Sequence, residues 1–257
     1  TDSDGNVASP IHGRTPPLAS FLILALMRSA RKLAGVRSST NPTWVIPNED
    51  PAGSRQDLAH HWLGLVRGMA EQLATESKQK GTASEARIAD SRKLPLADQS
   101  VDLVLTSPPY CTRIDYVIST SFELAALGVD RSSPAFVDLR RAAMGTPLAR
   151  RGARVEPSPG WPSSVKTLLG AIRSHRSKAS RSYYYKTYSQ YFRDCESSLR
   201  EIHRCLRVGR AAVLVVQTSY YKELCVDLPA LYVDMGKSLG FAGEVVSEVE
   251  VRRALAQ

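Results

Sequence analysis

The chain has 257 residues, which is enough for one large domain or two small ones. A hydrophobic content of 43% suits a soluble globular protein, and a formal charge of +9 favours a polyanionic partner, nucleic acid before an acidic membrane surface. The four cysteines have no C-x-x-C spacing, so we expect reduced thiols and neither a zinc ribbon nor another metal site.

The N-terminal region, residues 1–80, is predicted to be a polar leader followed by helices. Proline and glycine positions predict one helix at 16–34, and apolar residues at helical spacing predict a second at 55–78. The most apolar stretch, LASFLILALM at 18–27, is too short to span a bilayer and lacks the flanks of a signal peptide. We therefore expect a cytoplasmic protein with no membrane partner.

The rest of the chain, residues 81–257, alternates between strand and helix patterns. Strands are predicted at 86–89, 101–105, 210–216 and 244–251, and helices at 122–127, 188–206 and 228–239. This order predicts an α/β fold with a largely parallel sheet.

A basic segment, residues 129–186, interrupts this pattern with scattered glycine and proline, and we expect it to be irregular. It holds twelve Lys and Arg against three Asp and Glu, which accounts for the whole formal excess of the chain. One interpretation is a solvated loop. The other, favoured by interleaved tyrosines and a tryptophan, is a groove that holds nucleic-acid phosphates. The candidate nucleic-acid contacts are Arg113, Arg140, Arg141, Arg150, Arg151, Arg154, Lys178 and Arg181.

The apolar strand at 101–105 is followed directly by the sequence TSPPY. Its two prolines lack a backbone N–H and have a fixed φ, so the SPPY turn, residues 107–110, is stiff. Ligands of open α/β sheets bind at the carboxyl ends of strands, which makes this turn a candidate site. The alternative is an ordinary strand-ending turn. Cys111, the next residue, is a candidate nucleophile. It is a weaker candidate than the turn because no histidine lies near it in the sequence.

Two longer stretches extend from this motif and from the later strand. They are DSRKLPLADQSVDLVLTSPPYCTRIDY at 90–116 and SYYYKTYSQYFRDCESSLREIHRCLRVGRAAVLVVQTSYYK at 182–222. Both stretches resemble parts of the amino-methylating DNA methyltransferases. The first resembles the acidic strand end and the catalytic strand of that family, and the second resembles its later helix and strand. Serine before Pro-Pro-Tyr resembles the cytosine-N4 branch, since the adenine-N6 branch usually has Asp or Asn there. The resemblance implies a partial Rossmann-like methyltransferase sheet, with N-terminal helices and the basic segment as an insertion.

The resemblance also implies a role for each residue of the SPPY turn. In that family the donor is S-adenosylmethionine, and the target base is flipped out of the DNA duplex. The Ser107 hydroxyl and the Pro108 carbonyl would accept the hydrogens of a cytosine amino group, which favours attack by its nitrogen. Pro109 would keep the turn rigid, and Tyr110 would stack on the base.

The donor site is only partly represented. The resemblance implies donor contacts from Asp90, Ser91 and Thr106, although Asp90 suits a turn or a helix cap equally well. The family's Phe-x-Gly-x-Gly turn has no counterpart, because no two of the 16 glycines are adjacent or separated by a single residue. A backbone that closely approaches a nucleotide needs such glycines.

Three explanations of the missing glycine turn are open. A second chain supplies it, or the site has degenerated to leave a catalytically inactive DNA-binding subunit, or the chain is a piece of a longer one. Because the intact SPPY turn argues against decay, we expect a cytosine-N4 DNA methyltransferase that is active as a heterodimer with a partner chain carrying the Gly-x-Gly motif. A further alternative, an RNA or protein amino-methyltransferase, is disfavoured by serine at position 107.

Overall fold

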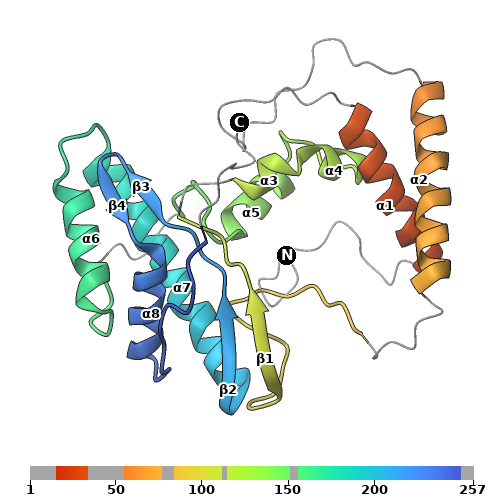
Figure 1. Ribbon diagram of the computed structural model, residues 1–257. Coiled ribbons are helices and arrows are strands. Elements are labelled where there is room, and N and C mark those ends of the chain that lie inside the picture. Colours follow the sequence, from red (N-terminus) through yellow and green to blue (C-terminus); the bar gives the residue numbers. More distant parts are fainter. Residues whose placement is uncertain (1–15, 34–54, 77–83, 112–114, 151–155, 250–257) are drawn as a thin grey trace. The chain divides into compact units, whose positions relative to one another are not determined.

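The computed structural model describes residues 16–33, 55–76, 84–111, 115–150 and 156–249 (Figure 1). The chain divides into two units, which consist of Thr1–Ala86, Tyr116–Ala142 and Arg252–Gln257 in the first and of Arg87–Asp115 and Ala143–Val251 in the second. The described part of the first unit is helical, and that of the second combines helices with short strands, so the fold is mixed α/β.

The described part of the first unit consists of helices, of which α2 and α4 pack on α1. Its described elements are α1 (Pro17–Leu33), α2 (Arg55–Glu76), α3 (Tyr116–Ser119), α4 (Ser121–Ala126) and α5 (Pro134–Ala142). Helix α1 contacts both α2 and α4. The Trp62 indole N–H of α2 donates to the Leu22 carbonyl of α1 (3.1 Å), and Arg31 of α1 forms an ion pair with Glu123 of α4. Polar contacts thus hold three helices from distant parts of the sequence together.

The second unit contains the two strands and the long helix that position the SPPY turn. Its described elements are β1 (Val101–Thr106), α6 (Ser163–Ser174), the π-helix η1 (Ser180–Tyr184), α7 (Tyr185–Cys205), β2 (Leu206–Leu214), β3 (Ser219–Tyr221), β4 (Leu224–Val226) and α8 (Leu228–Ser238). Strands β1 and β2 are parallel, and β3 and β4 form an antiparallel hairpin. The helices predicted at 16–34, 55–78, 122–127, 188–206 and 228–239 and the strands predicted at 101–105 and 210–216 are confirmed with small shifts of their ends.

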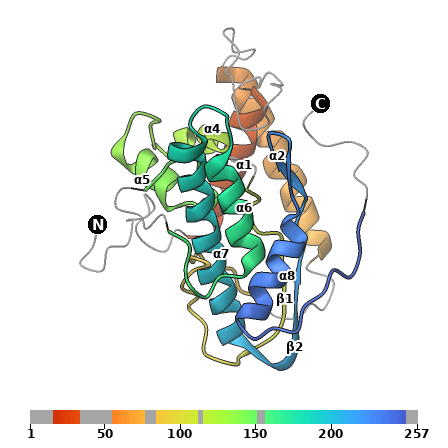
Figure 2. The same ribbon diagram turned by 90° about the vertical axis from the view of Figure 1, so that its left-hand side faces the viewer.

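The core of the second unit lies along the apolar face of α7. Tyr188, Phe192 and Cys195 recur at helical spacing and are buried. Trp161 packs edge-on against Phe192, with 6.4 Å between the ring centroids. Figure 2 shows α6, α7 and α8 standing together, and α6 contacts both of the other helices. One amphipathic helix therefore organises most of the buried surface of this unit.

A second, polar face of α7 holds the segment that precedes β1. The Ser198 hydroxyl lies 2.9 Å from that of Ser91, and the Glu201 carboxylate accepts the Leu94 backbone N–H at 2.8 Å. These contacts fix the path of residues 90–99 on α7, so the chain enters β1 from a defined position.

The sheet of β1 and β2 is covered on one face only within the described residues. Leu214 and Val216 pack on the core, whereas Leu103, Leu105 and Val213 point the other way and are 60%, 72% and 48% exposed. Parallel sheets are normally covered on both faces, and their strands are apolar for that reason. The apolar sequence of β1 is therefore typical of a strand that is covered on both faces of its sheet.

Two predicted strands are absent, and those predictions were wrong over the described residues. The stretches at 86–89 and 244–249 have no strand structure, and Ile88 and Val246 are 99% and 87% exposed. An alternation of apolar and polar residues predicts a strand with one buried face. A strand also requires a neighbouring strand that accepts and donates its backbone hydrogen bonds. Neither stretch has such a neighbour in the β1–β2 sheet.

The basic segment is more regular than expected, since it contains α5, α6 and η1. Two of its prolines begin helices instead of breaking them. Pro134 is the first residue of α5, and Pro162 is the N-cap of α6. Proline suits the start of a helix because its missing N–H would have no helical partner there. None of the helices in the described ranges has the length and hydropathy needed to cross a membrane.

Candidate functional site

The SPPY turn lies at the carboxyl end of β1, beside the end of β2. The Thr106 carbonyl at the end of β1 accepts the Val215 backbone N–H at 2.9 Å. The Ser107 hydroxyl donates in turn to the Val215 carbonyl at 3.0 Å. These two hydrogen bonds fix the beginning of the turn relative to both strands.

The Ser107 hydroxyl is held as a hydrogen-bond acceptor. Its oxygen lies 3.1 Å from the Tyr110 hydroxyl. A serine hydroxyl has one proton and two lone pairs, and here the proton is used on the Val215 carbonyl. Tyr110 is therefore the donor to Ser107, and within the described residues one lone pair of Ser107 is left for a ligand hydrogen. Ser107 is exposed, whereas Pro108, Pro109 and Tyr110 are half-buried.

Helix α7 supports the turn from the core. The Tyr191 hydroxyl donates to the Pro109 carbonyl at 2.8 Å. No sequence pattern singled out Tyr191, because its spacing is that of an ordinary core residue. The only available signal was a tyrosine, with its polar hydroxyl, on the buried face of a predicted helix.

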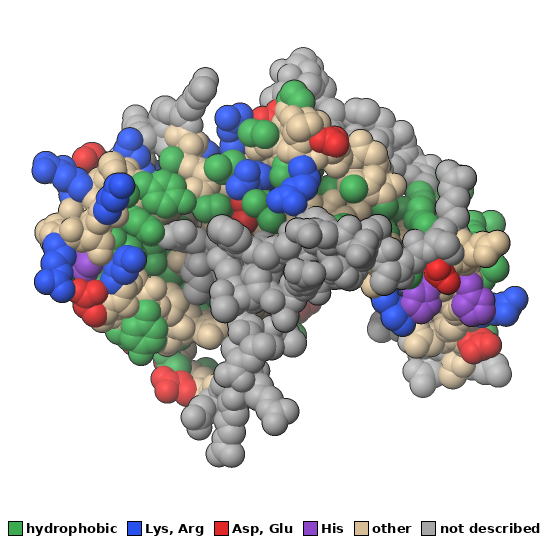
Figure 3. Space-filling view, turned by 90° about the horizontal axis from the view of Figure 1, so that it is seen from above, with side chains coloured by type: hydrophobic (Ala, Val, Ile, Leu, Met, Phe, Trp, Pro, Cys, Tyr) green, Lys and Arg blue, Asp and Glu red, His purple; other side chains and the backbone are tan. Residues whose placement is uncertain are grey.

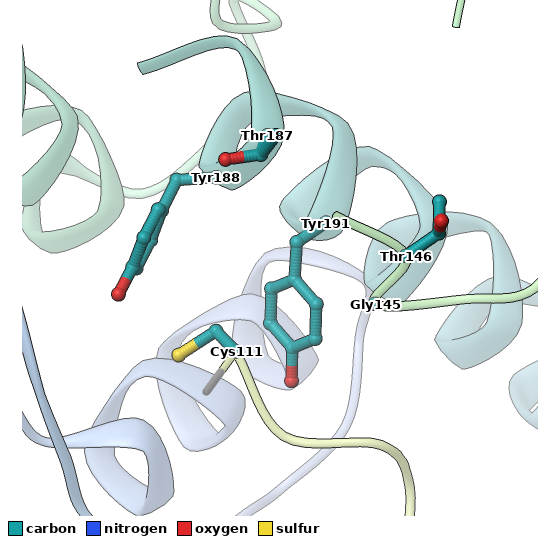
Figure 4. A pocket seen from close by; sticks show the side chains of 6 residues that line it. All are labelled: Cys111, Gly145, Thr146, Thr187, Tyr188 and Tyr191. Carbon is teal, nitrogen blue, oxygen red and sulfur yellow. The ribbon is translucent and has the colours of Figure 1, made fainter. Parts of the chain in front are cut away.

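Cys111 lies beside the same tyrosine and does not have the environment of a nucleophile. Figure 4 shows it in a small pocket with Tyr191 and Thr187 of α7, a cavity of about 10 Å³, which is room for about one water molecule. Burial raises the pKa of the Cys111 thiol to about 11, despite a contact of 3.4 Å with the Ser219 hydroxyl. The thiolate is the reactive form, so the geometry supports a structural cysteine.

The predicted donor contacts do not by themselves form a cofactor site. Both oxygens of the Asp90 carboxylate accept hydrogen bonds from the Arg92 guanidinium, at 2.7 to 3.1 Å, and these bonds lower the pKa of Asp90. The Ser91 hydroxyl is hydrogen-bonded to the Ser198 hydroxyl, and the Thr106 carbonyl accepts the N–H of Val215, the residue after β2. The cavity beside the turn is far too small for a nucleoside cofactor. The described residues therefore do not fit S-adenosylmethionine without further structure.

Arg150 has a different environment from the one the sequence suggested. Its guanidinium makes two hydrogen bonds of 2.8 Å to the carboxylate of Asp194, which is buried on α7. Arg92 contacts the same carboxylate at 3.1 Å. Because Arg150 shares this buried carboxylate with Arg92, its role is structural, and removing it would leave the charge of Asp194 only partly compensated. Arg150 is thus poorly suited to hold a phosphate.

The other predicted nucleic-acid contacts are distributed over both units. Arg140 and Arg141 lie in the last turn of α5, in the first unit. Lys178 and Arg181 lie between α6 and α7 in the second unit, and both are exposed. Arg113, Arg151 and Arg154 lie outside the described residues. Two of the described candidates therefore belong to the first unit and the others to the second.

Lys178 and Arg181 belong to a larger basic surface on α6, η1 and the start of α7. Its exposed basic residues are Lys166, Arg173, Arg176, Lys178, Arg181 and Lys186. Figure 3 shows blue Lys and Arg side chains gathered on the left, at the end of the second unit that carries α6. Four of these six were not among the sequence candidates, although all lie in the basic segment. The fold places all six on α6, η1, the first turn of α7 and the segment between α6 and η1.

Within the described ranges, no three His, Cys, Asp or Glu side chains are grouped as a metal site requires. Comparison of the chain with protein-family models, curated proteins and solved structures finds no match. The features of the described residues that bear on function are therefore the SPPY turn, the two-stranded parallel sheet and the basic surface.

Proposed function

We propose that the chain is the base-binding part of an amino-methylating DNA methyltransferase that acts on N4 of cytosine. The observation that carries the proposal is a rigid SPPY turn at the edge of a parallel sheet, with the Ser107 hydroxyl held as an acceptor. The pairing of β1 with β2 adds support, because the two stretches that resemble the family, 90–116 and 182–222, each contribute one of these strands.

The turn has the chemistry that an amino group requires. The lone pair of a cytosine amino group is conjugated with the ring, so the nitrogen attacks only when its hydrogens are held out of that plane. The Ser107 hydroxyl and the Pro108 carbonyl are two acceptors, one residue apart, on a backbone whose prolines restrict its motion. Acceptors fixed in advance stabilise the reacting geometry without reorganisation. Tyr110 supplies an aromatic ring beside them for a flipped base.

The methyl donor, S-adenosylmethionine, would be held mainly by a second polypeptide. Within the described residues each of the two parallel strands has an open edge, and Leu103 and Leu105 are exposed on the uncovered face. An open edge with an apolar face is suited to pairing with another chain. We propose that β1 and β2 are part of a Rossmann-like sheet that this partner completes, and that the partner carries the glycine turn.

DNA would be held by the basic surface on α6 and η1. Its exposed cations lie within one unit with the SPPY turn, and phosphate contacts of this kind position a duplex without reading its sequence. Tyrosines of the same segment, among them Tyr183, are half-buried beside these cations.

The test is purification of the chain with its native partner, followed by a methylation assay. Digestion of the DNA and mass spectrometry of its nucleosides should detect N4-methylcytosine. Tyr110→Ala should reduce methyl transfer far more than DNA binding, since one stacking contact contributes about 1–3 kcal/mol. Tyr220→Ala, which removes a tyrosine that is 69% exposed on β3, is the matched control and should leave the rate unchanged.

Each alternative gives a different result in this assay. DNA binding without a methylated nucleoside would identify an inactive DNA-binding subunit, and methylated RNA or protein would identify another amino-methyltransferase. N6-methyladenine would move the target from cytosine to adenine. Full activity of Tyr110→Ala would refute the role assigned to the turn.

A further inference from the structure

A chain of buried hydrogen bonds runs from the core of the second unit to the SPPY turn. The Tyr191 hydroxyl lies 2.8 Å from the Pro109 carbonyl and 3.2 Å from the Tyr232 hydroxyl of α8. The Tyr232 hydroxyl in turn lies 3.1 Å from the Cys195 sulfur. All three side chains are at least nine-tenths buried, so water does not compete for these contacts.

The donors in this chain follow from the number of protons available. The Pro109 carbonyl only accepts, so it uses the single proton of Tyr191. Tyr191 must then accept from Tyr232, which leaves the Cys195 thiol to donate to Tyr232. Every proton points toward the turn, and hydrogen bonds aligned in this way strengthen one another in a low-dielectric interior.

Burial keeps these donors in their protonated form. Desolvation raises the pKa values of Tyr191 and Tyr232 well above the ordinary value for a tyrosine, and it also raises the pKa of Cys195. Tyr191 therefore keeps the proton that it donates to the Pro109 carbonyl.

The other side of the turn is bounded by Gly145. A Cβ atom at this position would lie 3.4 Å from Pro109 Cβ, 3.5 Å from the Tyr110 carbonyl and 4.0 Å from the Tyr191 ring. Gly145 also has a φ of +75°, which most side chains disfavour. Pro109 is thus packed between a backbone with no side chain and the hydroxyl of Tyr191.

We propose that Tyr191, supported by Tyr232, is a positioning residue for the SPPY turn, an inference that rests on the proposed function of that turn. Ser107 anchors one end of the turn on the carbonyl of Val215, the residue after β2, and the Pro109 carbonyl anchors the other end on Tyr191. The two proline rings fix φ between these anchors, so little freedom is left for the Pro108 carbonyl. Tyr191 therefore sets the distance between the two acceptors without contacting the base.

The first test is hydrogen exchange of the full chain without DNA or donor. Tyr191→Phe keeps the ring and removes the hydroxyl, and the amide of Val215, which is protected by its hydrogen bond to the Thr106 carbonyl beside the turn, should exchange faster by about tenfold or more. Tyr185→Phe is the matched control, because Tyr185 is buried on the same helix and its ring contacts Arg173 rather than the turn. Equal exchange in the two variants would overturn the proposal.

A second variant keeps the test decisive if Tyr191→Phe does not fold. Tyr232→Phe removes the donor to Tyr191 but leaves the hydrogen bond to Pro109, so exchange of the same Val215 amide should become faster by a smaller factor. Because hydrogen exchange needs no activity, it tests the role of Tyr191 even if the complex methylates nothing. No change in Tyr232→Phe would contradict a connected chain of hydrogen bonds.

The second test uses the complex with its partner. Tyr191→Phe should lower kcat by about 10- to 100-fold, since small misplacements of reacting groups have effects of that size, and should leave KM for DNA nearly unchanged. Tyr185→Phe should change neither constant. A rise in KM alone would show that Tyr191 acts on DNA binding, which the proposal excludes.

Discussion

The basic surface on α6 and η1 makes a quantitative prediction about DNA binding. The perturbation is the triple variant Arg176→Gln, Lys178→Gln and Arg181→Gln, which removes three exposed cations within six consecutive residues. Each phosphate contact contributes about 0.9 to the slope of log affinity against log salt, so the slope should fall by about 2.7. Between 50 and 200 mM salt, the unmodified protein should lose about 40-fold more affinity than the variant.

The assay is fluorescence anisotropy of a labelled duplex, titrated at several salt concentrations. The control is the charge-matched triple variant Arg200→Gln, Arg210→Gln and Lys237→Gln, which changes exposed residues elsewhere in the same unit. Arg200 follows the start of α7 by about 22 Å along the helix axis, so it is far from η1. The control should change the slope much less.

Two results would refute this reasoning. An unchanged slope in the first triple variant would mean that these side chains are merely solvated. Equal falls in both triple variants would mean that the net charge of the protein, rather than a defined surface, attracts DNA. Neither result would depend on methylation activity.

Two further predictions concern acid stability and donor binding. The Glu201 carboxylate accepts hydrogen bonds from Arg204 and from the Leu94 N–H, which lower its pKa from 4.5 to about 2, so its contribution to stability is present above pH 4.5 and is lost as the pH falls toward 2. The free energy of unfolding, measured at a series of pH values, should therefore fall less steeply between pH 4.5 and pH 2 for Glu201→Gln than for the control Glu244→Gln. Identical pH profiles of the two variants would contradict the role assigned to Glu201. Calorimetry of the isolated chain with S-adenosylmethionine should show weak or no binding, because the Asp90 carboxylate is hydrogen-bonded to Arg92 and the glycine turn is missing. Micromolar binding, together with DNA methylation by this chain alone, would exclude the partner hypothesis.

The elements with a strong local signal were predictable from the sequence. Apolar spacing gave α1, α2, α7 and α8, because each of these helices buries one face whatever it packs against. The run at 101–105 followed by two prolines gave β1 and the turn, because proline ends a strand through its own covalent geometry. The same reasoning failed at 86–89 and 244–249, since a strand is completed only by a neighbour in space.

The roles of individual polar residues were decided by the tertiary structure. Arg150 and Arg181 are both arginines of the basic segment. Arg150 forms an ion pair with buried Asp194, whereas Arg181 is exposed, and this difference depends on the path of the folded chain. The sequence alone determined that the SPPY turn is rigid, since proline rings are local. Only the packing of α7 and α8 brought the Tyr191 hydroxyl to the Pro109 carbonyl, because a hydrogen bond between residues 82 positions apart depends on the fold.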